Sequence, residues 1–410
     1  MKKCKLLFLL LTALCSLLPS LLFSQMEWTC ATSSAGWSAR RTHASVFFDN
    51  KMWVLGGYDY PGYHRAWNDV WYSIDGSSWT CATESAGWSG RWEQTAVAFD
   101  NKIWILGGMD VNGNLRNDVW YSTDGVNWTQ ATPSAGWPGR SGHTSVVFDN
   151  KIWVLGGGQY NSPYRSDVWY STDGVNWTQA TPSAGWSARW GHTSFVFDNK
   201  IWVLGGLDGN QRNDVWYSTD GIYWTNVISS AGWSARWGHT SVIFDNKMWV
   251  LGGFDGTRRN DVWFSIDGVR WTQATPAAGW SQRYGHTTVA FDNLIWLLGG
   301  DNDPYYYNDV WFSSGLWIGE SKIATPSARN DFVVFPNPAK TVMRVRCPLS
   351  VKDKTELKIF DVSGKMIREI ASPPKSDRND GEIRISLKGI NPGIYFLRFG
   401  TDVKKFLVVK

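Results

Sequence analysis

A short segment that ends in two glycines occurs six times along this chain of 410 residues. Its copies follow one another at intervals of 51, 49, 49, 47 and 47 residues, and the first glycines of the pairs are Gly56, Gly107, Gly156, Gly205, Gly252 and Gly299. Self-similarity at a period of about fifty residues is typical of propellers and solenoids, in which each repeat is one supersecondary unit. The chain is therefore expected to fold as an array of six similar units.

The third repeat contains four strand-like segments. We call them strands a to d, and they cover residues 143–148, 151–155, 167–171 and a segment that begins near Trp177. Asp149-Asn150 and Asp173-Gly174 are turn sequences that join a to b and c to d as tight hairpins. The glycine pair is expected to end strand b, where a missing side chain permits positive φ. Four antiparallel strands per repeat predict one blade of an all-β propeller.

These repeats resemble those of the kelch family over about residues 26–315. The resemblance rests on an Arg-x-x-His sequence before strand a, on the double glycine, and on a Tyr-to-Trp spacing of seven residues, as at Tyr170 and Trp177. Phe264 and Trp271 keep this spacing in the fifth repeat. The resemblance implies a six-bladed kelch-type β-propeller.

The two ends of the array complement each other. The sixth repeat loses the Asp-Gly turn after Phe312, so it lacks its own strand d. Residues 28–32 match residues 79–83 one by one, yet no strands a to c precede them. We expect this N-terminal segment to be the outer strand of the last blade, which would close the ring and remove an open sheet edge. The alternative is that Leu316-Trp317 forms the missing strand.

The N-terminus and the C-terminus differ from the repeats in composition. A lysine-rich start, apolar residues 6–14 and a small residue at Ser24 indicate a secretory signal peptide over residues 1–24. The propeller is expected over residues 25–324. Residues 325–410 carry three motifs in order, at 335–339, 357–365 and 389–395, which resemble the C-terminal sorting domain of the type IX secretion system of Bacteroidota.

The resemblance of residues 325–410 implies a small β-sandwich, the secretion machinery as a partner, and transport across the outer membrane. A generic immunoglobulin-like module is the alternative, because alternating strands with Gly and Pro turns also fit it. No apolar run after the signal peptide is long enough to span a bilayer. The mature protein is therefore expected to be secreted or held at the cell surface.

Charge separates the two mature domains. The net charge is +4, but residues 326–410 hold 17 basic and 9 acidic residues, and the signal peptide holds three lysines. This leaves 20 of the 40 basic and 27 of the 36 acidic residues for the repeats. An acidic propeller argues against a nucleic-acid partner, since nucleic-acid binding needs a concentrated basic surface. Neutral glycans, basic peptides and cations stay open as ligands.

The cysteines and histidines fall at repeated positions. Cys30 and Cys81 occupy equivalent places on outer strands of neighbouring blades, and whether they pair is open, because such strands diverge and Cα atoms more than about 7 Å apart cannot be bridged without distortion. Five repeats place a histidine before strand a, and the second has Gln94 there. Equivalent positions separate these imidazoles around the ring, so we expect no metal and no cofactor.

Recognition is expected on the face that carries the b–c and d–a loops. The a–b and c–d turns are near copies, whereas the b–c loops differ in every blade, and variable loops on a rigid scaffold usually carry binding. One arginine precedes each strand a, and we call these the ring arginines: Arg40, Arg91, Arg140, Arg189, Arg236 and Arg283. A variable residue follows each of them, namely Arg41, Trp92, Ser141, Trp190, Trp237 and Tyr284.

The candidate ligand contacts come from three groups of residues on this face. They are the aromatic residues Trp92, Trp190, Trp237 and Tyr284, the loop residues Tyr63, His64, Tyr164 and Tyr305, and the ring arginines Arg91, Arg189 and Arg236. Aromatic rings can stack on sugar faces, and arginine can hold a carboxylate through two hydrogen bonds. For the ring arginines, an architectural role is preferred, because six identical copies suit packing between blades.

The expected function is binding of a glycan or a protein through this face. The alternative is a carbohydrate-active enzyme that processes sialic acid or a polysaccharide on the same face. Glu93 is an irregular acid there, since it stands where other repeats have glycine before the histidine. A glycosidase needs two carboxylates across a cleft, and the other acids are mostly repeated turn and strand residues, so binding is preferred and catalysis is left open.

Overall fold

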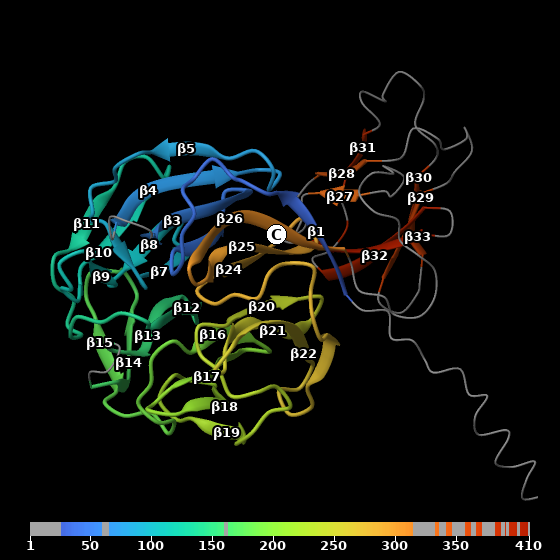
Figure 1. Cartoon of the computed structure of the whole chain (residues 1–410). Helices are drawn as coiled ribbons and strands as arrows, with labels where there is room; N and C mark the ends of the chain where they lie inside the picture. Colours follow the sequence, from blue (N-terminus) through green and yellow to red (C-terminus); the bar gives the residue numbers. More distant parts are fainter. Residues whose placement is uncertain are drawn as a thin grey trace, which may run out of the picture. The chain divides into compact units, whose positions relative to one another are not determined.

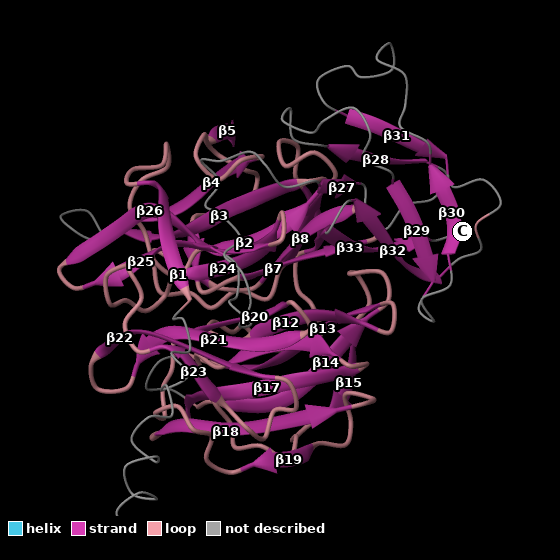
Figure 2. Cartoon of the chain, turned by 90° about the vertical axis from the view of Figure 1, so that its right-hand side faces the viewer, coloured by secondary structure: helices cyan, strands magenta, loops and turns pink. Residues whose placement is uncertain are grey.

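The computed structural model describes residues 26–59, 65–159 and 163–314, together with Ile390 and seven strands between residues 333 and 408. The chain divides into a first unit, residues 1–321, and a second unit, residues 322–410. The expected signal peptide and the candidate residues Tyr63 and His64 lie outside the described residues. Strands and loops account for all the described elements (Figure 2).

The first unit consists of six four-stranded antiparallel sheets arranged around a common centre (Figure 1). Blade 1 contains β2 (Ala44–Phe48), β3 (Lys51–Asp59), β4 (Arg65–Ser73) and β5 (Thr80–Thr83). Blade 2 contains β7 (Thr95–Phe99), β8 (Lys102–Leu106), β10 (Val119–Ser122) and β11 (Thr129–Thr132). Blade 3 contains β12 (Thr144–Phe148), β13 (Lys151–Gly157), β14 (Arg165–Ser171) and β15 (Thr178–Thr181).

The remaining three blades repeat this order. Blade 4 contains β16 (Thr193–Phe197), β17 (Lys200–Leu207), β18 (Gln211–Ser218) and β19 (Thr225–Ile228). Blade 5 contains β20 (Thr240–Phe244), β21 (Lys247–Phe254), β22 (Arg258–Ser265) and β23 (Thr272–Thr275). Blade 6 contains β24 (Thr287–Phe291), β25 (Leu294–Asn302), β26 (Tyr305–Ser314) and, from the other end of the chain, β1 (Glu27–Thr32). The predicted all-β, six-bladed fold is confirmed.

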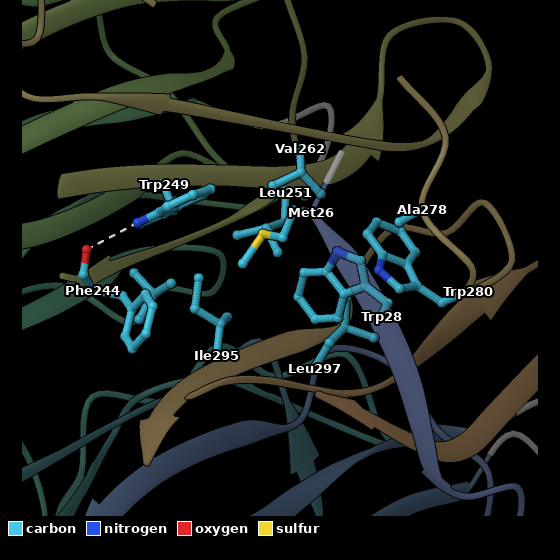
Figure 3. Close-up of a cluster of buried hydrophobic side chains, with 11 residues drawn as sticks. Met26, Trp28, Phe244, Trp249, Leu251, Val262, Ala278, Trp280, Ile295 and Leu297 are labelled. Atoms are coloured by element: carbon cyan, nitrogen blue, oxygen red, sulfur yellow. Dashed lines mark hydrogen bonds between the residues drawn. The ribbon is translucent and has the colours of Figure 1, made fainter. Parts of the chain in front are cut away.

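The ring closes through the N-terminal strand, as predicted. β1 runs antiparallel to β26, and its register places Glu27 opposite Ser314 and Trp28 opposite Ser313. Met26 and Trp28 are buried in the apolar cluster between blades 5 and 6 (Figure 3). The Trp28 ring meets Trp280 edge to face, with 5.9 Å between the centroids. Blade 6 is thus held by residues from both ends of the propeller, and the alternative segment, Leu316-Trp317, lies outside the described residues.

Packing between blades uses the tryptophan of each strand b. In blade 2 the Trp104 indole donates a hydrogen bond to the Phe99 carbonyl and lies against the Asp-Gly turn of blade 3. Gly174 in that turn has a φ of 73°, and a Cβ on it would lie 2.1 Å from the Trp104 ring. Glycine is therefore required there both for the turn and for the ring. These tryptophans therefore pack each blade against the turn of the next.

The glycine pair lies at the end of strand b in blades 2 and 3, as expected, whereas in the other four blades the strand runs one or two residues past it. In blade 3 the strand continues through the pair to Gly157, and its register with β14 shifts between Leu155 and Gly157. Both glycines have positive φ, 55° and 85°. A β-bulge of this kind redirects the strand without ending it, so in the other four blades the strand carries the chain further toward the b–c loop than the turn signals indicate.

Cys30 on β1 and Cys81 on β5 are free thiols.

The second unit contains two antiparallel sheets. β27 (Val333–Phe335), β28 (Val342–Arg346) and β31 (Glu382–Ser386) form one, and β30 (Met366–Ile370), β29 (Leu357–Asp361), β32 (Gly393–Phe399) and β33 (Asp402–Val408) form the other. That they form a sandwich stays a prediction. In the described part of the chain, no helix has the length and apolar character to cross a bilayer.

Candidate functional site

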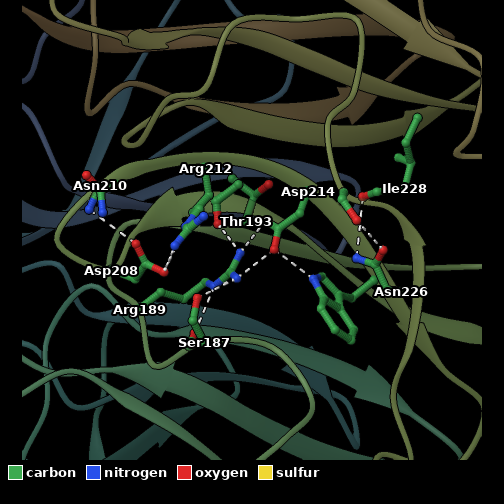
Figure 4. A network of polar contacts seen from close by, with 12 residues as sticks. Ser187, Arg189, Thr193, Asp208, Asn210, Arg212, Asp214, Asn226 and Ile228 are labelled. Carbon is green, nitrogen blue, oxygen red and sulfur yellow. Dashed lines mark hydrogen bonds and ion pairs between the residues drawn. The ribbon is translucent and has the colours of Figure 1, made fainter.

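The ring arginines are buried in ion pairs. Arg189 donates from Nη1 and Nη2 to the two carboxylate oxygens of Asp214, over 2.6 and 2.8 Å, and from Nη1 to the Gly205 carbonyl over 2.8 Å (Figure 4). The corresponding pairs in the other blades are Arg40–Asp69, Arg91–Asp118, Arg140–Asp167, Arg236–Asp261 and Arg283–Asp309. The aspartates belong to strand c, so each arginine ties the d–a loop to its own blade.

This geometry matches the architectural role that the repeats favoured. Arg91, Arg189 and Arg236 are at most 1% exposed, and their guanidinium groups are satisfied by carboxylate and carbonyl oxygens. A buried ion pair of this kind is retained only if its donors and acceptors are matched. We therefore leave these three candidates out of the surface described below.

Six residues close the centre of the b–c and d–a face through their backbones. We call them the axial ring: Thr42, Glu93, Gly142, Gly191, Gly238 and Gly285. Each N–H donates to the carbonyl oxygen of the ring residue in the preceding blade, over 2.6 to 3.2 Å. All six have a positive φ, between 50° and 65°, which is a region that glycine enters without strain. Several of the residues predicted as ligand contacts lie around this ring.

Each of the five histidines directly follows a residue of the axial ring and links neighbouring blades. In each case Nε2 is within 2.8 to 3.2 Å of a threonine hydroxyl in the preceding blade, or in the last blade for His43. Burial and a nearby ring arginine lower the pKa of His43, His192 and His239 to about 3. In the second blade Gln94 donates to the Leu55 carbonyl. These imidazoles are therefore uncharged structural groups.

Four of the predicted aromatic residues lie around the axial ring. Trp190 and Trp237 have centroids 5.0 Å apart, and Trp237 meets Tyr284 edge to face at the same distance. Trp92 packs against Tyr58 at 4.9 Å. We call the set Trp92, Trp190, Trp237 and Tyr284 the aromatic surface. Trp190 is 5% exposed, and the other three are half-buried.

An arginine and a buried acid complete the ring of contacts between blades 6 and 1. Arg41 lies 5.3 Å from the Tyr284 ring and 5.7 Å from the Tyr58 ring, and it donates to the Tyr284 hydroxyl. Its Nη1 also donates to Asp301 over 2.7 Å. Burial raises the pKa of Asp301 to about 6, although Arg41 and Arg258 oppose that rise.

Glu93 connects blade 2 with blade 4 across the axial ring. The Trp190 indole N–H donates to its Oε2 over 3.0 Å, and the Ser141 side chain opposes the effect of burial on the carboxyl's pKa. Burial raises the pKa of this carboxyl above its usual range. Glu93 takes a place where four other blades have glycine, with a φ of 54°. The aromatic surface is thus joined to an acid on one side and to Arg41 on the other.

The remaining candidates lie apart from this surface. Tyr164 is half-buried beside the start of β14, and Tyr305 is 68% exposed at the start of β26. Among the described residues, no contact joins either tyrosine to the aromatic surface. Tyr58 and Phe254 do pack on it, and the candidate set omitted both. They follow the glycine pair and bridge to the variable residue of the same blade, a link that aligning the six repeats at the glycines could have revealed.

Two family models match the chain. The KLHDC2/KLHL20/DRC7 Kelch-repeats domain matches residues 13–206 and 191–317. The Secretion system C-terminal sorting domain matches residues 333–410. No curated protein matches the chain. The two models cover the two units separately and agree with both resemblances seen in the sequence.

Proposed function

This chain belongs to the kelch-repeat family, and on that premise we propose that its propeller is a binding module for a surface saccharide. The sorting domain marks the protein as one exported by the type IX system and then secreted or attached to the cell surface. The observation that carries the proposal is the row of contacts from Trp190 through Trp237 to Tyr284. Those three residues come from three blades and meet beside the axis.

The blade architecture does not require aromatic residues at these positions. Blades 1 and 3 have Arg41 and Ser141 in the same place, and their sheets form as the others do. Packing between blades is provided by other tryptophans, such as Trp53 and Trp37, which are each 1% exposed. Aromatic side chains that a scaffold does not need, gathered on its most variable face, suit recognition.

A saccharide fits the chemistry of this face better than an anionic ligand does. Ring faces of tryptophan and tyrosine pack on the C–H groups of a sugar, while indole and hydroxyl groups offer hydrogen bonds at their edges. The charges of Arg41 and Asp301 already pair with each other at 2.7 Å. A protein ligand is the other class that aromatic and arginine side chains favour, and the experiment separates the two.

The test is a glycan array probed with the full exported chain and with Trp92→Ala and Trp237→Ala. Each substitution should weaken binding by about tenfold or more, because aromatic residues dominate such contacts. Tyr223→Ala is the control, since Tyr223 is 79% exposed in a c–d turn, away from the b–c loops. Bound sugars are analysed after incubation.

Three results would change the proposal. Unchanged glycan binding in both tryptophan variants, with the fold intact, would place the ligand elsewhere. Chemically altered sugar would favour the carbohydrate-active enzyme and make Glu93 the first residue to test. Absence of any glycan hit would direct the search to protein partners.

A further inference from the structure

Glu93 occupies a backbone position that disfavours any side chain. Its φ is 54°, and the equivalent residues Gly142, Gly191, Gly238 and Gly285 have φ values between 56° and 65°. A non-glycine residue in the left-handed region costs free energy, and such positions are concentrated at functional sites. The backbone hydrogen bonds of the axial ring need no side chain, so the ring itself gives no reason for a glutamate.

The surroundings of Glu93 bring other groups to its carboxylate. A Cβ on Gly142 would lie 2.0 Å from the Trp190 indole nitrogen, so Trp190 can lean over the ring toward Glu93 only because residue 142 is glycine. Ser141 is small, and its hydroxyl donates to the Gly158 carbonyl of its own blade over 3.1 Å. Blade 3 thus leaves room at the axis, and blades 2 and 4 fill it with an acid and an aromatic ring.

The Glu93 carboxylate has no ion-pair partner among the described residues, although the charge of Arg41 acts on it. Each ring arginine pairs with an aspartate, and Asp301 pairs with Arg41. Within the described residues, no basic side chain forms an ion pair with Glu93; its carboxylate accepts a hydrogen bond from the Trp190 indole, and Ser141 and Arg41 lower its pKa against the effect of burial. A carboxylate removed from water without a direct ion-pair partner is unfavourable, and a positive group of a ligand would supply that partner.

We propose that Glu93 contacts the ligand directly and that the ligand presents a cationic nitrogen to it, beside Trp190 and Trp237. An acid flanked by aromatic rings favours an ammonium group through charge pairing and cation–π attraction. The excess of acidic residues in the propeller, 27 against 20 basic residues, also attracts cations. This inference rests on the proposed binding function and specifies the chemistry of its ligand.

The experiment compares two oligosaccharides that differ in charge alone, namely β-1,4-linked glucosamine oligomers with free amines and the same oligomers fully N-acetylated. A short lysine peptide tests whether the amine can come from a protein. Binding to the full exported chain is measured by calorimetry, with Glu93→Gln, Glu93→Gly and Thr42→Gly as variants. Thr42 is the matched control, because it is the other non-glycine residue of the axial ring, with a φ of 50°.

We expect binding of at least one amine-bearing probe, weakened by about tenfold or more in Glu93→Gln, which keeps the size of the side chain and removes its charge. Glu93→Gly should lose the same binding while its unfolding temperature stays close to that of the parent chain, because glycine relieves the strained φ. Thr42→Gly should keep full affinity. If Glu93 had only a structural role, its substitution would not reduce the affinity for the amine-bearing probe while leaving the unfolding temperature unchanged.

Equal affinity for the acetylated and the free-amine oligomers would overturn the inference. So would unchanged affinity in Glu93→Gln, or failure of both amine-bearing probes to bind at millimolar concentration. If neutral glycans bind and depend on Trp237 but not on Glu93, the proposed binding function stands and the cation assignment fails. Glycan binding that depends on neither residue removes both.

Discussion

A residue that recurs in every blade can bind the ligand or stabilise the scaffold, and the residues that it contacts show which role it has. The ring arginines are the clearest case, since each guanidinium meets a strand-c carboxylate and a glycine carbonyl in the interior. The residue directly after each arginine varies, and the structure places those side chains around the axis. Repetition in this chain therefore marks architecture, and departure from repetition marks the candidate site.

The buried histidines predict how the propeller responds to acid. Their pKa falls to about 3 in His43, His192 and His239, whereas an unfolded histidine takes up a proton near pH 6.5. The unfolded state then binds more protons between these values, so the free energy of unfolding should decrease as pH falls from about 6.5 toward about 3. Denaturant unfolding at a series of pH values measures this slope.

His192→Gln is the variant that isolates one imidazole, because Gln94 shows that glutamine fits the equivalent place in blade 2. Removing one titrating group should lower the slope by up to about 1.4 kcal/mol per pH unit. Stability at pH 8 should change little by comparison. An identical slope in the variant and the parent chain would mean that His192 does not carry the effect.

At the scale of elements, the outer strand of blade 6 is the one that the chain must bring from its other end. β1 supplies both a hydrogen-bonded edge and two buried side chains, Met26 and Trp28. The other five blades build their outer strand from the next residues of the chain. Closure of the ring therefore depends on one short strand, Glu27–Thr32.

Trp28→Ala should destabilise the propeller by about 3–5 kcal/mol, the usual cost of removing a buried tryptophan. Thr29→Ala is the control on the same strand, because Thr29 is exposed, and its effect should stay within about 0.5 kcal/mol. Chemical denaturation followed by tryptophan fluorescence gives both values. Similar midpoints for the two variants would show that β1 is not needed for closure.

Element boundaries were less predictable than element number. Turn pairs such as Asp149-Asn150 have positive φ at both residues, 49° and 53°, as a two-residue hairpin of this type requires, and they mark the a–b corner correctly. The glycine pair ends strand b in blades 2 and 3, as expected, but in the other four blades the strand runs one or two residues past it. A bulge and a strand end carry the same glycine signal, because both need a positive φ.

At the scale of the whole molecule, export and recognition belong to separate units. Residues 322–410 form a compact unit of their own and include the whole sorting-domain match, residues 333–410. A chain that ends at residue 321 should fold its propeller and stay in the periplasm. Cell fractionation and surface labelling check this, with full-length Trp237→Ala as a control that should still reach the surface. Surface display of the shortened chain would contradict the assignment.

The sequence by itself determined the number of blades, their four-strand order, the closure of blade 6 by the N-terminal strand and the C-terminal sorting domain. These follow from local patterns: turn residues, glycine pairs and a match between residues 28–32 and 79–83. Each of these patterns lies within a few residues or recurs along the chain, so it can be recognised in the sequence alone.

The tertiary structure alone decided what each repeated or variable side chain does. Glu93 and Trp190 are 97 residues apart in the chain and share a hydrogen bond, and Arg41 reaches Asp301 from 260 residues away. Ring closure brings such residues together around one axis, and no local pattern encodes which of them then touch. The same closure buries the ring arginines and leaves the aromatic surface beside the axis, because charge pairing and exposure depend on neighbours in space.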